Sequence, residues 1–253
     1  MPSTREIFEN HSGNLLHKWD HYFEIYDRYF TPYAGKEVHV MEIGVSQGGS
    51  IDLWKKFFGE KLHYYGIDIN PKCKNFESEN VRIFIGSQED KVFLEKVKAE
   101  IPTLDILIDD GGHTMRQQIV TFETLFSKIS NNGLYLCEDN HTSYWYTAGG
   151  GMKRKGTYIE YIKNLLDVMH LWYAGKKTYI KNYSLKEQIY AIHVYDSIVV
   201  IEKRIITEPF STRVGNLTVG YMEEEKRSVL FSIGHFIFKI KNRLRSAFYK
   251  GKE

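Results

Sequence analysis

Short apolar runs alternate with amphipathic helical segments through the middle of the chain. Five of the runs are typical of buried parallel strands, and a glycine or an acidic residue follows each one: 38–43, 62–67, 81–85, 104–108 and 134–137. Apolar residues at helical spacing predict helices over 50–58, 91–99, 115–129 and 158–172, the third closed by Asn131-Asn132-Gly133. Two further strands, 189–194 and 197–201, flank a predicted tight hairpin at Tyr195-Asp196. We therefore expect an α/β fold with a doubly wound, mostly parallel seven-stranded sheet and an antiparallel C-terminal hairpin.

Length and composition exclude several classes of protein. The chain has 253 residues, enough for one domain with appendages. Lys and Arg total 34 against 32 Asp and Glu, and this balance argues against nucleic-acid binding, which needs an excess of cations. Two cysteines, Cys73 and Cys137, do not make a disulfide scaffold. Because no apolar leader and no uncharged apolar run of 18 residues occurs, we expect a cytoplasmic protein.

Polar side chains gather where the predicted strands end. In doubly wound sheets, ligands bind outside the carboxyl ends of the strands. The polar residues at these ends are Glu42, Asp68, Ser87, Asp109, Asp110, Glu138 and Asp139. Two acidic doublets after neighbouring strands are more than solvated loops require. We therefore place the candidate site at this edge of the sheet.

The first strand leads into a glycine-rich loop, Gly44 to Ser50. Its spacing differs from the G-x-G-x-x-G of dinucleotide-binding folds, which argues against a nicotinamide dehydrogenase. Glu42 would repel a phosphate but attract a cationic ligand such as S-adenosylmethionine (SAM), whose sulfonium and ammonium carry positive charge. Asp68 could then accept hydrogen bonds from the ribose of SAM. The alternative is that the glycine loop serves only the packing of the helix on the sheet. We assign to the SAM site Glu42, Gly44, Ser46, Gly48, Ser50, Asp68, Ser87, Gln88 and Asp109.

The acidic residues after the fourth and fifth strands predict a divalent-cation site. Adjacent strands lie about 5 Å apart, so the loops that carry Asp110 and Glu138-Asp139 can converge. Three converging carboxylates repel one another unless a cation lies between them. Hard oxygen ligands favour Mg²⁺, Mn²⁺ or Ca²⁺ over Zn²⁺. The alternative for Glu138 and Asp139 is a pair of anions that stabilises a helix start.

His113 is the candidate general base. It follows Asp110 across two glycines, which bring the backbone close to the site. A neutral imidazole near pH 7 is suited to accept a proton from a reacting group. The alternative is a histidine that caps a helix or lies on the surface.

Four segments resemble the class I SAM-dependent methyltransferases of the macrocin and mycinamicin sugar O-methyltransferase type: MEIGVSQGGS, YYGIDIN, ILIDDGGH and GLYLCEDNHTSYW. Cephalosporin hydroxylase-type methyltransferase proteins are similar in the same segments. The resemblance runs from about His17 to about Lys203. It implies that Asp110, Glu138 and Asp139 bind magnesium and that His113 is the base. The resemblance also places Glu42, Gly44, Gly48 and Asp68 at the SAM site. The family often has Ser where this chain has Gly112, a departure that could loosen the placement of His113.

These features favour a metal-dependent transfer of the SAM methyl group to a sugar hydroxyl of a glycan or a glycosylated small molecule, as in polysaccharide biosynthesis. The cation (Mg²⁺ or Mn²⁺) would bind two neighbouring acceptor oxygens, and His113 would remove the proton. A catechol or another small phenol is the alternative acceptor. A non-catalytic SAM-binding scaffold is the alternative from another class, although it would not need the clustered acids.

The flanking segments are less specific. We expect a helical N-terminal cap over 1–36, the methyltransferase domain over 37–203 and a C-terminal extension over 204–253. The aromatic residues of segment 11–30 fit core packing or a cap over the site. Beside the metal site, three residues are candidates for contact with a sugar, in what is otherwise a plain surface loop: His141, Tyr144 and Trp145. The basic amphipathic stretch 231–249 fits peripheral contact with an anionic membrane, a homo-oligomer contact or docking on the core.

Overall fold

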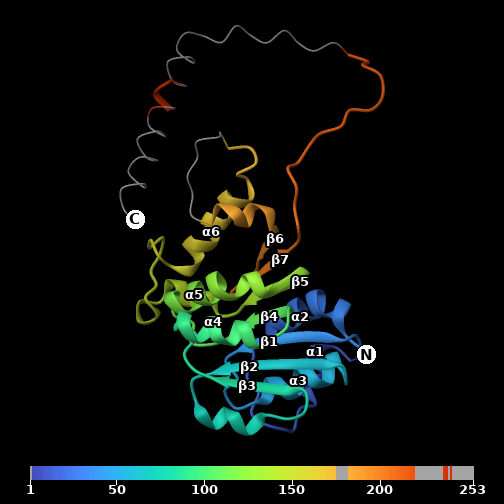
Figure 1. Ribbon diagram of the computed structural model, residues 1–253, viewed down its shortest axis with the longest axis vertical. Coiled ribbons are helices and arrows are strands. Elements are labelled where there is room, and N and C mark those ends of the chain that lie inside the picture. The colour runs from blue at the N-terminus through green and yellow to red at the C-terminus, as the bar shows by residue number, and fades with distance from the viewer. Residues whose placement is uncertain (1, 175–181, 220–235, 239, 241–253) are drawn as a thin grey trace.

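The computed structural model describes residues 2–174, 182–219, 236–238 and 240, and a single seven-stranded sheet organises them (Figure 1). The strand order is β3-β2-β1-β4-β5-β7-β6. The strands are β1 (Val38–Ile43), β2 (Leu62–Asp68), β3 (Val81–Ile85), β4 (Leu104–Asp109), β5 (Ile129–Cys137), β6 (Ile189–Val194) and β7 (Val199–Lys203). The first five strands run parallel, and β7 pairs antiparallel with both β5 and β6. The doubly wound sheet with an antiparallel edge is therefore confirmed.

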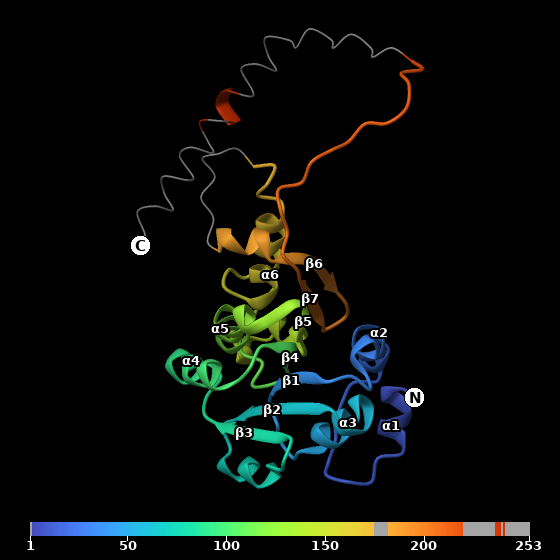
Figure 2. The same cartoon turned by 45° about the vertical axis from the view of Figure 1, so that its right-hand side comes forward.

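Helices cover both faces of the sheet (Figure 2). One face carries α1 (Thr4–Glu9), α2 (Phe23–Phe30) and α3 (Gly49–Phe58), and the other carries α4 (Lys91–Glu100), α5 (Met115–Leu125) and α6 (Tyr158–Met169). Short 3-10 turns span Asp20–Tyr22, Thr31–Tyr33, Pro71–Phe76, Phe126–Lys128, Asn140–Tyr144, Tyr146–Ala148 and Tyr183–Glu187. Strand order reverses where β1 lies between β2 and β4, and this switch point is where such sheets bind ligands.

Side chains of the central strands alternate between two hydrophobic clusters. On β1, Val38 and Val40 join the cluster under α1–α3, whereas Met41 and Ile43 join the cluster under α4–α6. This alternation follows from the two-residue period of a strand. It also directs Glu42, which lies between Met41 and Ile43, toward the α1–α3 side.

Aromatic residues of the N-terminal segment form part of the core. Tyr22, Tyr26 and Phe30 are fully buried, and the rings of Tyr26 and Phe30 stack with centroids 5.7 Å apart. Both rings meet the indole of Trp54 on α3 edge-on, at 5.3 and 5.5 Å. Core packing is therefore confirmed for these positions. The segment before β1 therefore packs against α3 on this face of the sheet.

Besides the helix expected over 158–172, which ends at Met169, two places differ from the prediction by more than one residue. The helix expected over 115–129 ends at Leu125, and after a 3-10 turn the chain enters β5 at Ile129, so Asn131–Gly133 lie inside the strand. The physical reason is tertiary: the Lys203 ammonium donates hydrogen bonds to the carbonyls of Phe126, Ser127 and Ile129. These contacts satisfy the backbone groups that a helix end leaves open.

The second difference is at the hairpin. The strand expected over 197–201 spans Val199–Lys203 instead, because Ser197 lies in the turn with a φ of +64°. The stretch 231–249 lies outside the described residues except for 236–238 and 240, so its three candidate roles stay predictions. Within the described part of the chain, no helix is long and apolar enough to span a bilayer.

Candidate active site

A cavity of about 520 Å³ lies at the carboxyl ends of the parallel strands. Loops after all five parallel strands contribute to it, as does the segment Leu15–Trp19 that precedes α2. The lining includes most of the predicted site residues: Gly44, Ser46, Ser50, Asp68, Ser87, Gln88, Asp110, His113, Glu138 and Asp139. The structure thus brings residues from separate strands to one edge of the sheet, as the sequence predicts.

The glycine loop after β1 requires its glycine at position 44. Gly44 has a φ of +97°, and a Cβ built there would lie 2.0 Å from the carbonyl oxygen of Asp110. Farther along the loop, Ser46 has a φ of +50°, and its N–H donates a 2.8 Å hydrogen bond to Oδ2 of Asp68. Oδ1 of Asp68 accepts from the N–H of Asn70 at 2.8 Å. Asp68 therefore fixes both the loop after β1 and the turn after β2.

Three residues assigned to the SAM site do not line the cavity: Glu42, Gly48 and Asp109. Glu42 is fully buried and accepts hydrogen bonds from Ser50 Oγ and the Tyr64 hydroxyl, both at Oε2. Within the described part of the chain, its Oε1 has no hydrogen-bond partner. Burial raises the pKa of Glu42. Glu42 therefore lies behind the cavity wall and supports it through Ser50, which lines the cavity.

Asp109 has a similar supporting position. Its carboxylate accepts hydrogen bonds from Gln88 Nε2 and from the Tyr135 hydroxyl, each at 3.0 Å. Burial raises the pKa of Asp109 to about 7. The other end of the Gln88 amide accepts a 2.7 Å hydrogen bond from the N–H of Gly112. Gln88 therefore holds the loop that carries His113.

Gly112, where the family often has Ser, lies close to the start of α5. A Cβ at Gly112 would lie 2.3 Å from the amide nitrogen of Gln117, so the loop packs tightly against the start of α5. The N-cap of α5 is Thr114, which forms a capping box with Gln117. The helix-cap alternative for His113 is therefore wrong, because the neighbouring residue does the capping.

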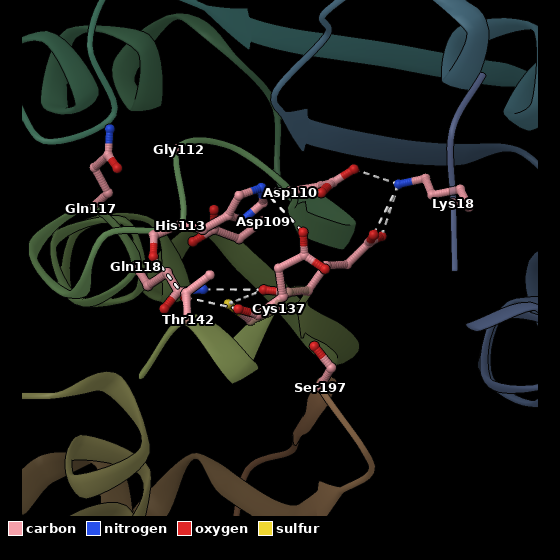
Figure 3. Close-up of polar contacts among 12 residues, drawn as sticks. Lys18, Asp109, Asp110, Gly112, His113, Gln117, Gln118, Cys137, Thr142 and Ser197 are labelled. Carbon is pink, nitrogen blue, oxygen red and sulfur yellow. Dashed lines mark hydrogen bonds and ion pairs between the residues drawn. The ribbon is translucent and has the colours of Figure 1, made fainter. Parts of the chain in front are cut away.

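His113 points toward the acidic residues (Figure 3). Its Nε2 lies 3.4 Å from Oδ2 of Asp139 and 3.8 Å from Oδ1 of Asp110. Its Nδ1 is buried and finds no hydrogen-bond partner in the residues that the structure describes, and its carbonyl accepts a 2.8 Å hydrogen bond from Thr142 Oγ1. His113 and Asp139 both have a φ of +55°. Such backbone conformations are costly for residues with a side chain and occur preferentially at functional sites.

The acidic residues divide into two groups. Ligand atoms of Asp110, His113 and Asp139 lie within 4.8 Å of one another, close enough for one cation to contact all three. The Glu138 carboxylate does not belong to this group. It is buried, and its Oε1 accepts a 2.7 Å hydrogen bond from the Tyr26 hydroxyl. In this conformation, only two of the three predicted magnesium ligands face His113.

Lys18 is the site residue that the sequence analysis missed. Its ammonium lies 2.5 Å from Oδ2 of Asp110 and 3.0 and 3.1 Å from the two oxygens of Glu138 (Figure 3). Burial alone would lower the pKa of Lys18, but the charges of Asp110, Glu138 and Glu42 together raise it well above its usual range. No local pattern marks Lys18, because its partners lie 92 and 120 residues away in the chain.

The three candidate sugar-contact residues lie beside the cavity rather than in its wall. The ring of His141 meets Trp145 at 4.7 Å and Trp19, which does line the cavity, at 5.7 Å. Tyr144 and Trp145 are 48% and 54% exposed. Trp19, His141 and Trp145 thus form an exposed aromatic cluster next to the cavity.

A second set of potential metal ligands lies at the opposite end of the strands. Residues His39 on β1 and His63 on β2 are register partners, and their rings stack at 4.7 Å. The carboxylate of Glu37 completes a group whose ligand atoms lie within 4.8 Å of one another. This group is separate from the cavity.

Comparisons with known proteins identify relatives of this chain. No protein-family model matches the chain. Demethylmacrocin O-methyltransferase from Streptomyces fradiae is 32% identical over 216 residues, which cover 80% of this chain and 54% of that protein. Mycinamicin VI 2''-O-methyltransferase from Micromonospora griseorubida is 33% identical over 189 residues, or 70% of this chain and 47% of that protein. The chain therefore spans about half the length of these relatives.

A solved structure agrees with these relatives. The MycE methyltransferase from the mycinamycin pathway, in complex with Mg and SAH, superposes with a TM-score of 0.74 at 29% identity. The match covers 81% of this chain and 55% of that one. By sequence and by fold, the region that these comparisons cover is a class I SAM-dependent methyltransferase domain related to the macrocin and mycinamicin sugar O-methyltransferases.

Proposed function

We propose that the protein is a divalent-metal-dependent O-methyltransferase that moves the SAM methyl group to a sugar hydroxyl, with His113 as general base. The observation that carries the proposal is the convergence of Asp110, His113 and Asp139 in the same cavity as the Gly44 loop and Asp68. One site then holds a base, a set of oxygen ligands and a cofactor cradle.

The cavity fits SAM better than a phosphate-bearing cofactor. Within the described residues, its lining contains one lysine, Lys18, and no arginine, and the ammonium of Lys18 is paired with carboxylates. Pyrophosphate would therefore find no available lysine or arginine. The close approach of backbone at Gly44 and the carboxylate of Asp68 instead suit an uncharged ribose and a cationic sulfonium.

The acidic residues fit magnesium. Oδ1 of Asp110 and Oδ2 of Asp139 face the same space as Nε2 of His113, and Mg²⁺ prefers such oxygen ligands. We infer that Asp110 and Asp139 hold the cation and that Glu138 joins them when it is released from Lys18. A bound divalent cation would lower the pKa of an acceptor hydroxyl and fix its orientation. Because magnesium favours oxygen, the imidazole of His113 stays free to act as a base.

Within this arrangement, His113 accepts the hydroxyl proton at Nε2. The carboxylate of Asp139, 3.4 Å away, stabilises the imidazolium that forms. Thr142 holds the carbonyl of His113, and Gln88 holds Gly112, so the loop is fixed on both sides of the ring. Holding the base and both reactants in one geometry supplies much of the rate in such a transfer.

Two observations favour a sugar as the acceptor. Relatives named as O-methyltransferases of demethylmacrocin, of mycinamicin VI and of a rhamnosyl tetracenomycin C match most of the chain at about 30% identity. The aromatic cluster of Trp19, His141 and Trp145 beside the cavity offers flat surfaces that suit the apolar face of a sugar ring. A sugar hydroxyl is also far less acidic than a phenol, so it needs both a cation and a base.

The test is methyl transfer from labelled SAM, with magnesium present, to a panel of deoxysugar glycosides and a panel of catechols. We expect label on a sugar hydroxyl, with loss of transfer in His113→Gln but retained SAM binding. Transfer to catechols alone would contradict the acceptor class. Full activity of His113→Gln on a sugar would contradict the role of His113 as general base.

A further inference from the structure

Lys18 has a buried ammonium among three carboxylates. Its side chain is 2% exposed, and it makes close contacts with Asp110 and Glu138. Burying a charge is costly unless partners compensate it, so the arrangement is stable only while these partners stay ionised and in place. The ammonium therefore neutralises acids that would otherwise repel one another.

Lys18 engages Glu138, one of the three acids that the proposed cation site needs. Lys18 takes Oδ2 of Asp110 and both oxygens of Glu138. While it does so, Glu138 is not available as a metal ligand. Binding of a divalent cation by the full set of three acids therefore requires the ammonium to move.

A second position for the ammonium is already built. Oε1 of Glu42 is buried, has no hydrogen-bond partner among the described residues, and lies 3.9 Å from Nζ of Lys18. The other oxygen of Glu42 accepts hydrogen bonds from Ser50 and Tyr64, which hold the carboxylate in place. A shift of about 1 Å would bring the ammonium within hydrogen-bond distance of Oε1.

The backbone around Lys18 allows the side chain to move alone. A Cβ at Gly49 would lie 2.4 Å from the carbonyl oxygen of Leu15, so the segment before Lys18 is packed tightly against the start of α3. After Lys18, Tyr22 and Tyr26 are fully buried. The lysine side chain is long and flexible, and it can change position between these fixed points.

We propose that Lys18 is a positioning residue that holds Glu138 in this structure and moves to Glu42 when a divalent cation binds, which releases Glu138 to join Asp110 and Asp139. The inference rests on the proposed function, because it takes Asp110, Glu138 and Asp139 as the metal ligands. It assigns Glu42 a role that does not depend on direct contact with SAM: it receives the displaced ammonium. The affinity for the cation then depends partly on its competition with the Lys18 ammonium for the Glu138 carboxylate.

The test is a titration of Mn²⁺ in the absence of SAM, followed by calorimetry and by the electron paramagnetic resonance of free Mn²⁺. We expect Lys18→Met to bind Mn²⁺ at least about tenfold more tightly than wild type, since no ammonium has to be displaced. Glu42→Gln should weaken binding by about tenfold in the wild-type background and have little effect in the Lys18→Met background. The double-mutant cycle separates a relocation of Lys18 from a simple charge effect of Glu42.

Three outcomes would overturn the inference. Unchanged or weaker binding in Lys18→Met would show that the ammonium does not compete. An equal effect of Glu42→Gln in both backgrounds would show that Glu42 acts by its charge alone. If Asp139→Asn binds Mn²⁺ as well as wild type does, or if neither protein binds it, the proposed metal site is overturned, and with it the role of Lys18.

Two controls keep these results interpretable. His39→Ala removes one member of the other group of potential ligands, Glu37, His39 and His63, and should leave unchanged the Mn²⁺ binding that Asp139→Asn removes. If Lys18→Met fails to fold because it leaves acids unpaired, Lys18→Gln replaces it, and the Glu42→Gln comparison is repeated in that background. Circular dichroism without metal checks the fold of each variant.

Discussion

The hydroxyl of Tyr22 donates a 2.7 Å hydrogen bond to Oδ1 of Asp139, and four residues later the hydroxyl of Tyr26 donates an equally short one to Oε1 of Glu138. Residues four apart lie on the same face of a helix, so one face at the start of α2 orients both acids of the doublet. The N-terminal segment therefore helps to build the candidate metal site. This segment lies more than 100 residues from the doublet in the chain.

Tyr22→Phe tests this role. The substitution keeps the buried ring but removes the hydroxyl that fixes Asp139. We expect metal affinity to fall by roughly 10-fold, as for loss of other groups that orient a metal ligand. Tyr29→Phe is the matched control, because the hydroxyl of Tyr29 contacts Tyr195 instead of the acids. Equal effects of the two substitutions on Mn²⁺ titrations would contradict the orienting role.

Asp68→Asn tests the cofactor site. The change keeps the shape of the side chain but removes the charge that accepts hydrogen bonds from Ser46 N–H and, in the proposal, from the ribose. We expect SAM affinity to fall by roughly 10- to 100-fold, as for loss of a charged hydrogen-bond acceptor. Calorimetric titration measures it, with Glu95→Gln on the surface of α4 as the control. SAM affinity that survives the change would place the ribose elsewhere.

Gly44→Ala tests the close packing of the two loops. The new Cβ would meet the Asp110 carbonyl at 2.0 Å, and φ is +97°. Gly35 also has a positive φ, of +72°, but nothing lies within 4 Å of its Cβ position. Urea unfolding should show that Gly35→Ala costs about 1 kcal/mol and Gly44→Ala at least about 2 kcal/mol more. Similar losses in the two variants would contradict the contact.

His39 predicts a pH dependence of stability. Burial and the neighbouring His63 lower the pKa of His39, against the opposite effects of Asp105 and Glu37. The unfolded chain then binds more protons at this residue than the folded protein, so the free energy of unfolding falls as the pH drops below about 6.5. In His39→Gln, urea midpoints measured between pH 5 and 7 should show a shallower dependence on pH than in wild type. An unchanged slope would exclude His39 as the cause.

The sequence predicts the features that strand ends determine. Asp68, Asp110, His113 and Asp139 each follow an apolar run, and because parallel strands end at one edge, their convergence follows from the topology alone. That edge could therefore be located without a structure.

Features that depend on distant contacts could not be predicted in this way. The end of α5 at Leu125 depends on Lys203, which lies two strands later. The place of Lys18 depends on Asp110 and Glu138, far along the chain. Glu42 and Asp109 lie behind the cavity wall because of the neighbours that surround them in the interior. The alternation along a strand predicts which face of the sheet a side chain points to, but not whether it lines the cavity.

The central claim is that a divalent cation at the acidic loops works with His113 to methylate a sugar hydroxyl. The most direct test is the rate of methyl transfer at saturating SAM and acceptor, after removal of metal with a chelator and after return of magnesium. For wild type we expect a loss of at least about 100-fold on removal and full recovery on return, with no recovery in Asp139→Asn. A chelated protein that keeps its full rate, together with a fully active Asp139→Asn, would contradict the account.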